Sequence, residues 1–180
     1  MRQQHRGFTL IEAVIAVAVS GICLGVAIPS LTGAISAAHA GSAKSAMVET
    51  FTRALTHSTV TGAEVVVCPS TGDACVDTTD WSMGWIAFAD LDGNRSRGPG
   101  DTPLMHQAAL ANGVHLRGTT GRKLIVFKPT GAAAAGSNAT LTLCDRRGPA
   151  KASALILANN GRFRVGEADP SAAVACMQPL

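Results

Sequence analysis

Two arginines near the end of the chain have the spacing to hold phosphate groups. Residues 162–165 have the character of a strand, and they follow an Asn-Asn-Gly run that favours a turn. Because alternate residues of a strand share a face, Arg162 and Arg164 would point together and Phe163 to the opposite side. Two guanidinium groups about 7 Å apart can bind neighbouring phosphates of a duplex. The pair is therefore a candidate contact for a polyanion.

A second group of cations, Arg146, Arg147 and Lys151, lies one turn and one strand upstream. A hairpin at residues 159–161 would bring this loop near Arg162, so we expect both groups at one end of the domain. Residues 8–94 carry two basic and eight acidic side chains, whereas residues 95–180 carry eleven basic and four acidic ones. This asymmetry favours a polyanionic partner. The alternative is that these cations are solvated charges that protect exposed strand edges.

The start of the chain predicts a membrane helix. Residues 8–28 are mostly apolar and carry no charge except Glu12, and about 20 apolar residues are enough to span a bilayer as a helix. A carboxylate inside hydrocarbon is costly unless a cation meets it, so Glu12 is expected to have a partner. A secretory signal has its cleavage site after the apolar run, whereas here the small Gly7 precedes it. The other interpretation is a single-pass anchor with an unpaired Glu12.

The segment after the apolar run is expected to continue as an amphipathic helix. Pro29 lacks an N–H and should end or kink the first segment, after which a helical pattern resumes to about residue 61. One side of this helix is polar and the other should cradle a domain. The apolar stripe consists of Leu31, Ile35, Ala38, Ser42, Ser45, Met47, Val48, Phe51, Ala54 and Leu55.

After Gly62 the pattern changes to short strands separated by turn clusters, which predict an antiparallel sheet or sandwich. The alanine-rich residues 132–137 are expected to form a flexible loop, and Trp85 is expected in the core. The expected strands are residues 63–68, 85–90, 103–107, 114–117, 123–128, 140–144, 153–157, 162–165 and 173–177.

Residues 6–12, Arg-Gly-Phe-Thr-Leu-Ile-Glu, resemble the class III signal of type IV prepilins. The resemblance implies that a prepilin peptidase cuts between Gly7 and Phe8 and methylates the new amino terminus. It also implies that the apolar helix anchors the subunit in the inner membrane and later packs in the core of a helical filament. Glu12 would then pair with the terminal amine of a neighbouring subunit.

Further residues resemble the GspH/FimT group of minor pilins and pseudopilins. The matching segments are residues 68–70 (Cys-Pro-Ser), Cys75 and residues 81–90 (Trp-Ser-Met-Gly-Trp-Ile-Ala-Phe-Ala-Asp). They imply a long N-terminal helix whose C-terminal half packs against a domain of two β-sheets. Residues 161–164, Gly-Arg-Phe-Arg, are similar to the Gly-Arg-x-Arg motif of FimT-type minor pilins, which bind DNA during natural transformation. This similarity implies DNA contact by Arg162 and Arg164, helped by the upstream cations.

The chain has five cysteines, and Cys23 lies inside the apolar run as a small hydrophobic residue. The other four are Cys68, Cys75, Cys144 and Cys176, and an even set on the exported side predicts two disulfides. We favour Cys68–Cys75, which closes a small turn-rich loop, and Cys144–Cys176, which ties the C-terminal segment to the sheet. Four cysteines allow three pairings, and a zinc site is the competing interpretation, although neither pair has CxxC spacing.

The sequence gives no support for catalysis or a bound cofactor. The histidines are dispersed, and no Ser/His/Asp or Cys/His set accompanies them. Asp90, Asp92 and Asp101 resemble a calcium loop only in part, because Arg95 stands where an EF-hand needs glycine. We therefore expect a tight turn at these residues, and neither a metal site, a cofactor nor an enzyme.

Together these features predict an α+β pilin fold: residues 1–7 as a cleaved leader, 8–28 as the transmembrane and filament-core helix, 29–61 as its amphipathic continuation and 62–180 as a β-rich globular domain. The expected function is that of a minor type IV pilin of a Gram-negative bacterium that binds extracellular double-stranded DNA non-specifically for uptake. Its partners would be this DNA, other pilins, the prepilin peptidase and the inner membrane, with the globular domain in the periplasm and then outside the cell. The alternative is a structural minor pilin or type II secretion pseudopilin that primes assembly without binding DNA.

Overall fold

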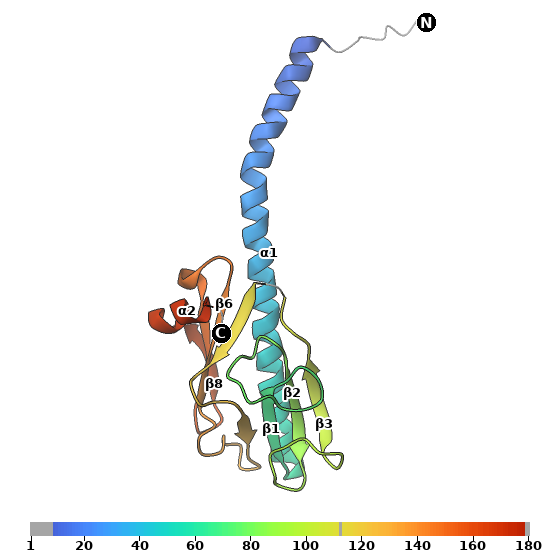
Figure 1. The fold of residues 1–180 in the computed structure, drawn as a ribbon, viewed down its shortest axis with the longest axis vertical. Helices are drawn as coiled ribbons and strands as arrows, with labels where there is room; N and C mark the ends of the chain where they lie inside the picture. Colours follow the sequence, from blue (N-terminus) through green and yellow to red (C-terminus); the bar gives the residue numbers. More distant parts are fainter. Residues whose placement is uncertain (1–8, 112, 179–180) are drawn as a thin grey trace, which may run out of the picture. The chain divides into compact units, whose positions relative to one another are not determined.

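The computed structural model describes residues 9–111 and 113–178, apart from the side chains of residues 26, 27 and 29. The contacts between residues divide the chain into two compact units, Met1–Ile35 and Ser36–Leu180. The first unit contains the beginning of helix α1 (Leu10–Thr61), and the second contains the rest of α1, two β-sheets and a short helix (Figure 1). Helix α1 has 52 residues, so the helix does not end at Pro29.

The first unit is an apolar helix whose large side chains are exposed. Leu10, Val17 and Ile22 are 83%, 73% and 71% exposed. Among the described residues, α1 is the one helix that is long and apolar enough to cross a membrane. Exposed apolar surface is unfavourable in water by about 25 cal/mol per Å². This unit therefore needs an apolar environment, either lipid or other protein chains.

The part of α1 in the second unit is amphipathic, as expected. Its buried residues recur at steps of three and four, the period of one helix face; they are Ala40, Ala43, Met47, Thr50, Phe51, Ala54 and Ser58. The predicted stripe is wrong at its start, because Ser42 and Ser45 are exposed while Ala40 and Ala43 face the core. Serine and alanine are both small, so size alone does not distinguish the two faces of this part of the helix.

Two four-stranded antiparallel sheets follow the helix, and their eight strands correspond to the first eight segments expected from the sequence. The first sheet has the order β3-β2-β1-β5, with β1 (Glu64–Pro69), β2 (Trp85–Asp90), β3 (Thr102–Gln107) and β5 (Ile125–Phe127). The second sheet has the order β4-β6-β7-β8, with β4 (Val114–Gly118), β6 (Ala139–Asp145), β7 (Ser153–Leu157) and β8 (Phe163–Glu167).

Three strands of the first sheet, β1, β2 and β5, are buried on both faces, whereas the edge strand β3 is not. Val65 and Val67 pack into the main core with α1, while Val66 and Cys68 pack into a second apolar cluster on the other face. Burial on both faces explains why β1 is a continuous apolar run rather than an alternating one. Trp85 lies in the main core, as expected, and its indole N–H donates to the Thr50 hydroxyl at 2.9 Å.

One aromatic side chain of α1 joins the helix to both sheets. The Phe51 ring is 5.6 Å from the Phe127 ring of the first sheet and 5.9 Å from the Phe163 ring of the second, in edge-to-face arrangements. Such pairs contribute about 0.5–1.5 kcal/mol beyond the area that they bury. Phe51 therefore fixes how the two sheets meet on the helix.

The last expected strand is wrong, because residues 173–176 belong to helix α2 (Pro170–Cys176). Asp169 is its N-cap, and the carboxylate accepts hydrogen bonds from the N–H groups of Ser171 and Ala172 at 2.9 and 3.3 Å. Pro170 takes the first helical position, where its missing N–H costs nothing. These capping signals outweigh the short apolar alternation from which a strand was predicted.

The alanine-rich loop is irregular, as expected, but it is packed rather than flexible. Ala133 and Ala134 are buried. The Ala134 N–H donates to the Val126 carbonyl at 2.8 Å, and the Val126 N–H donates to the Ser137 hydroxyl at 3.0 Å. The loop thereby covers the free edge of β5, which would otherwise leave backbone groups unpaired.

Both expected disulfides are present, Cys68–Cys75 and Cys144–Cys176. Cys144 alternates along β6 with the core residue Leu143, so its side chain lies on the outer face of the second sheet. The Cys144–Cys176 bond therefore holds α2 against that outer face, where Cys176 is buried.

We expect the Cys144–Cys176 bond to stabilise the fold more than the Cys68–Cys75 bond. The two bonds close sequence separations of 32 and 7 residues, which the chain-entropy model values at about 3.7 and about 2.4 kcal/mol. Replacing Cys144 and Cys176 by alanine should therefore lower the free energy of unfolding more than replacing Cys68 and Cys75. Urea denaturation of the full chain in a neutral detergent measures both losses, and equal losses would contradict the loop-length argument.

Candidate nucleic-acid interface

The β7–β8 hairpin presents its two arginines on one side and its phenylalanine on the other. Arg164 is paired with Ile156 across the hairpin, and both Arg162 and Arg164 are exposed. The Phe163 ring instead reaches Phe51 in the core. The alternation expected from the sequence is therefore present in the structure.

A hollow of about 320 Å³ lies beside the arginines. It is lined by Ile156, Ala158, Asn160, Arg162, Phe163 and Arg164. Within residues 9–111 and 113–178, neither Arg162 nor Arg164 has a carboxylate partner. Because a guanidinium group matches the geometry of phosphate oxygens, this hollow can accept a phosphate from solvent.

The glycine before the two arginines is required by the backbone. Gly161 has a φ of 78°, and its N–H donates to the Ala158 carbonyl at 3.0 Å to close the turn. A side chain at this position would overlap the carbonyl oxygen of Gly131. The Arg162 N–H donates to the Asn160 side chain at 3.1 Å, which fixes the residue that follows the turn. The turn thus sets the starting direction of β8.

The second group of cations lies at the other end of the same sheet, so its expected position near Arg162 is wrong. Loop 146–151 precedes Ser153, which pairs with Glu167 at the end of β8. The hairpin turn follows Leu157, at the opposite end of β7. Four steps of about 3.3 Å separate these ends, or about 13 Å. The Cys144–Cys176 disulfide does not bring the two groups of cations together, because Cys144 is also at the loop end of the sheet.

Arg147 in this loop is engaged by a buried acid. Its Nε and one terminal nitrogen donate to the two oxygens of Asp145 at 2.8 and 2.7 Å, and its backbone N–H donates to the same carboxylate at 2.9 Å. The Arg147 guanidinium holds the pKa of Asp145 below its usual value, and the carboxylate raises the pKa of Arg147. Arg147 therefore stabilises the loop, and its charge is largely matched.

The other two cations of the loop are exposed. Arg146 lies against the backbone of Gly113, where a side chain would overlap its guanidinium stem. Lys151 ends a short 3₁₀ turn, η1 (Pro149–Lys151). Neither has an ion-pair partner among the residues that the structure describes.

The aspartates of loop 90–101 satisfy backbone groups. Carboxylate oxygens of Asp90, Asp92 and Asp101 lie within 4.8 Å of one another. Both oxygens of Asp101 accept backbone N–H groups, from Leu91 at 3.0 Å and Gly98 at 2.7 Å, and these bonds lower the pKa of its carboxyl. Asp90 likewise accepts two backbone N–H groups of the loop. These backbone hydrogen bonds fit the turn expected at these residues.

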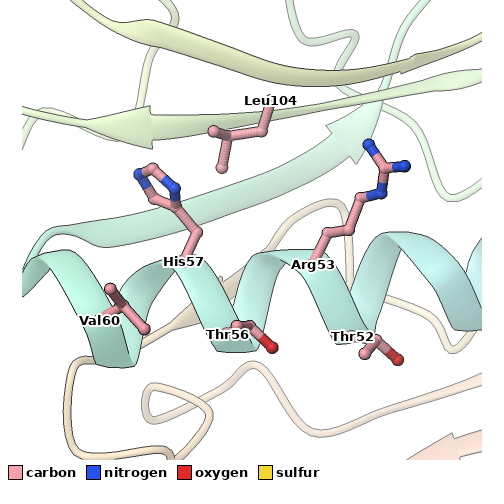
Figure 2. A pocket seen from close by; sticks show the side chains of 6 residues that line it. All are labelled: Thr52, Arg53, Thr56, His57, Val60 and Leu104. Carbon is pink, nitrogen blue, oxygen red and sulfur yellow. The ribbon is translucent and has the colours of Figure 1, made fainter.

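An apolar groove of about 460 Å³ lies between α1 and β3. Figure 2 shows Arg53 and His57 of the helix extending toward the strand that carries Leu104. The Arg53 guanidinium is already bound to Glu49 at 2.8 Å.

At the N-terminus the structure describes Glu12 but not the predicted cleavage site. Gly7 and Phe8 lie outside the described residues. Thr9 and Glu12 form a reciprocal cap at the start of α1. The Thr9 N–H donates to the Glu12 carboxylate at 3.0 Å, and the Glu12 N–H donates to the Thr9 hydroxyl at 3.3 Å. The pairing of Glu12 with another subunit remains a prediction.

Comparisons with known proteins identify the family. The family model described as Type II transport protein GspH matches residues 45–161, and the model of the prokaryotic N-terminal methylation motif matches residues 2–28. The chain belongs to the GspH family. Two crystal forms of the type IV minor pilin FimU from Pseudomonas aeruginosa PAO1 have the same fold, with TM-scores of 0.51 and 0.53 at 14% identity. They cover 71% of this chain, which covers 94% and 89% of theirs. No curated protein matches.

The GspH family and the methylation motif fit a membrane-anchored pilin-like protein with a globular domain outside the cytoplasm. The family suggests association with other pilins and processing by a prepilin peptidase. The family and the fold are pilin-like. The expected pilin fold, a long N-terminal helix with two antiparallel sheets, is confirmed.

Acid should destabilise this GspH-family domain partly through Asp145. Its pKa is lowered in the folded protein, so the unfolded chain takes up a proton first as the pH falls, and this stabilisation is lost progressively below about pH 4. Asp145→Asn should lower the free energy of unfolding by about 2–3 kcal/mol at pH 7, as expected for the loss of a hydrogen bond to a charged group. The free energy of unfolding of this variant should also depend less on pH between 5 and 2. Urea denaturation at a series of pH values measures both effects. An unchanged pH dependence would contradict the assignment.

Gly161→Ala should disturb the hairpin because the left-handed backbone costs about 1–2 kcal/mol for a residue with a side chain, and the added methyl group would meet Gly131. We expect the free energy of unfolding to fall by at least this amount. Gly136→Ala is the matched control, since Gly136 also has a positive φ of 83° but its added methyl group meets nothing within 4 Å. Equal losses in the two variants would mean that the contact with Gly131 is unimportant.

Proposed function

We propose that this GspH-family protein is a minor type IV pilin that enters the pilus and binds extracellular double-stranded DNA for uptake in natural transformation. The observation that carries the proposal is the β7–β8 hairpin, which holds Arg162 and Arg164 exposed on one side of the sheet. Neither has a carboxylate partner within the described part of the chain, so both are available to a polyanion. Phosphate contacts carry no sequence information, so the binding would be non-specific and sensitive to salt.

The first unit would deliver the domain to the filament. In this proposal the prepilin peptidase cuts between Gly7 and Phe8 and methylates Phe8, and the apolar helix holds the subunit in the inner membrane. Glu12 then pairs with the terminal amine of a neighbouring pilin, which compensates for its carboxylate in an apolar environment. The exposed apolar surface of α1 supports this role, because only lipid or other subunits would cover it. The globular domain would move from the periplasm to the cell exterior with the pilus.

Arg146 and Lys151 would contact the same duplex at a second place. They lie about 13 Å further along the sheet, and a duplex presents one charge per about 1.7 Å of its axis. The two ends of the sheet would therefore meet different phosphates. Arg147 would add less, because its guanidinium is already bound to Asp145.

A second candidate function is supported by the description of the family model, Type II transport protein. In this case the protein would be a type II secretion pseudopilin or a structural minor pilin. Its basic end would dock another subunit and prime assembly without binding DNA. Carboxylates of a neighbouring subunit would then occupy the arginines instead of phosphates.

Replacing Arg162 and Arg164 by alanine tests the DNA-binding proposal. The double variant should bind duplex DNA several-fold more weakly, because two phosphate contacts are lost. The slope of log K against log salt should become shallower by about 0.9 for each lost contact. A fluorescence titration of the full chain in a neutral detergent, at two salt concentrations, measures the affinity and the slope.

The matched control replaces Arg53 and Arg97 by alanine. These changes remove the same charge from positions outside the second sheet. Both residues already have carboxylate partners, Glu49 and Asp73. We expect these changes to leave the salt dependence nearly unchanged. If the hairpin variant binds DNA as the wild type does, the assignment of DNA contact to Arg162 and Arg164 is wrong.

A transformation assay separates the two candidate functions. A strain carrying the Arg162→Ala, Arg164→Ala variant should still assemble pili but take up less DNA than the wild type. Loss of pili or of type II secretion in this strain would instead favour the structural role.

A further inference from the structure

Arg122 is a third cation on the side of the second sheet that carries the hairpin arginines. It lies in the turn between β4 and β5, far from the hairpin in the sequence. Its Nε donates to the Asn138 carbonyl at 2.8 Å, and a terminal nitrogen donates to the Asn138 side chain at 3.3 Å. Asn138 immediately precedes β6 and alternates with the buried Ala139, so its side chain faces outward. Asn138 therefore holds Arg122 at the outer face.

Strand register places Arg164, Arg162 and Asn138, the residue that binds Arg122, in two neighbouring rows of the outer face. In one row Thr140 pairs with Ile156, which pairs with Arg164. The next row continues the same register beyond the pair of Ala139 with Leu157, and contains Asn138, Ala158 and Arg162. The backbone bond from the Ala158 N–H to the Arg162 carbonyl, at 2.9 Å, belongs to this second row. Arg122 lies at the Asn138 end and Arg162 at the other end.

The arginine rows occupy the half of the outer face that α2 leaves open. Cys176 lies against the other half, where Thr142 and Cys144 are buried. The outward residues of the two rows include no acid, and Thr140 is only partly buried. Arg122 has no carboxylate partner in the described residues, whereas the adjacent Lys123 is bound to Asp77 at 2.7 Å. The open half of the face is therefore a cationic surface around the hollow.

We propose that Arg122 is a third phosphate-binding residue and that Arg122, Arg162 and Arg164 together contact both strands of a DNA duplex. This inference rests on the proposed DNA-binding function and deepens it. Arg162 and Arg164 are about 7 Å apart along β8 and suit neighbouring phosphates of one strand. Asn138 is two strand spacings from Arg162, or about 10 Å. Arg122, which is bound to Asn138, therefore lies well to the side of the line through Arg162 and Arg164.

The sideways position of Arg122 favours a duplex over a single strand. In a duplex the second backbone runs beside the first across a minor groove about 6 Å wide, a gap that long arginine side chains can bridge. A single strand has no second backbone, and it must bend to reach the third cation. Arg122 should therefore add more to duplex binding than to single-strand binding.

Arg122→Gln tests this inference, because glutamine keeps a donor for the Asn138 carbonyl but removes the charge. We expect duplex affinity to fall about 3- to 10-fold and the salt slope to become shallower by about 0.9. Affinity for a single strand of the same length should fall less. Arg122→Lys should restore most of the salt slope, because it returns the charge. The titrations use the full chain in a neutral detergent, with a 30-base-pair duplex and one of its strands.

Lys123→Gln is the matched control. It removes the same charge from the residue next to Arg122, a lysine that Asp77 already binds. Its salt slope should equal that of the wild type, and thermal unfolding of all variants checks that the fold is kept. If Arg122→Gln binds duplex like the wild type while Arg162→Ala with Arg164→Ala binds weakly, the third contact is wrong and the proposed function stands. If the double variant also binds normally, the proposed function itself fails. Equal losses for duplex and single strand would overturn the two-strand arrangement.

Discussion

The contact of Phe51 with Phe127 and Phe163 ties the second sheet to the helix and to the first sheet. A helix side chain that meets one aromatic ring from each sheet leaves little freedom in how the sheets sit on the helix. Because Phe163 is held inward, the residues on either side of it must point outward. The exposure of Arg162 and Arg164 is therefore a consequence of core packing. The proposed binding surface thus depends on a buried hydrophobic contact rather than on a dedicated loop.

Local patterns in the sequence predicted most of this fold, because strand alternation and turn residues are local properties. β2 and β7 have the predicted bounds, and the alternation around Phe163 is correct. The strand predicted at the C-terminus failed because the cap formed by Asp169 and Pro170 was overlooked, although it is a local signal. An Asp followed directly by a Pro is typical of the start of a helix, with the Asp as N-cap and the Pro at the first helical position.

The composition of the candidate site was harder to predict, because it depends on which segments are neighbours in space. Loop 146–151 was expected beside Arg162, but antiparallel register places the loop and the hairpin turn at opposite ends of β7. Arg122 was missed because Asn138 brings it to the site from another turn, and its sequence neighbours give no sign of this. Counting charges also treated Arg147 as free, whereas its pairing with the buried Asp145 becomes visible only in three dimensions.

The alanine-rich segment at residues 132–137 looks like an inert spacer, but the arginine hairpin rests on it. The Ala133 N–H donates to the Asn159 carbonyl at 3.0 Å, and Gly131 touches Gly161. An epitope tag or fluorescent label inserted between Ala132 and Ala134 would therefore displace the hairpin, even though the sequence there suggests an ideal insertion point. A label would be safer on the exposed loop around Asn94, which joins β2 and β3 of the first sheet.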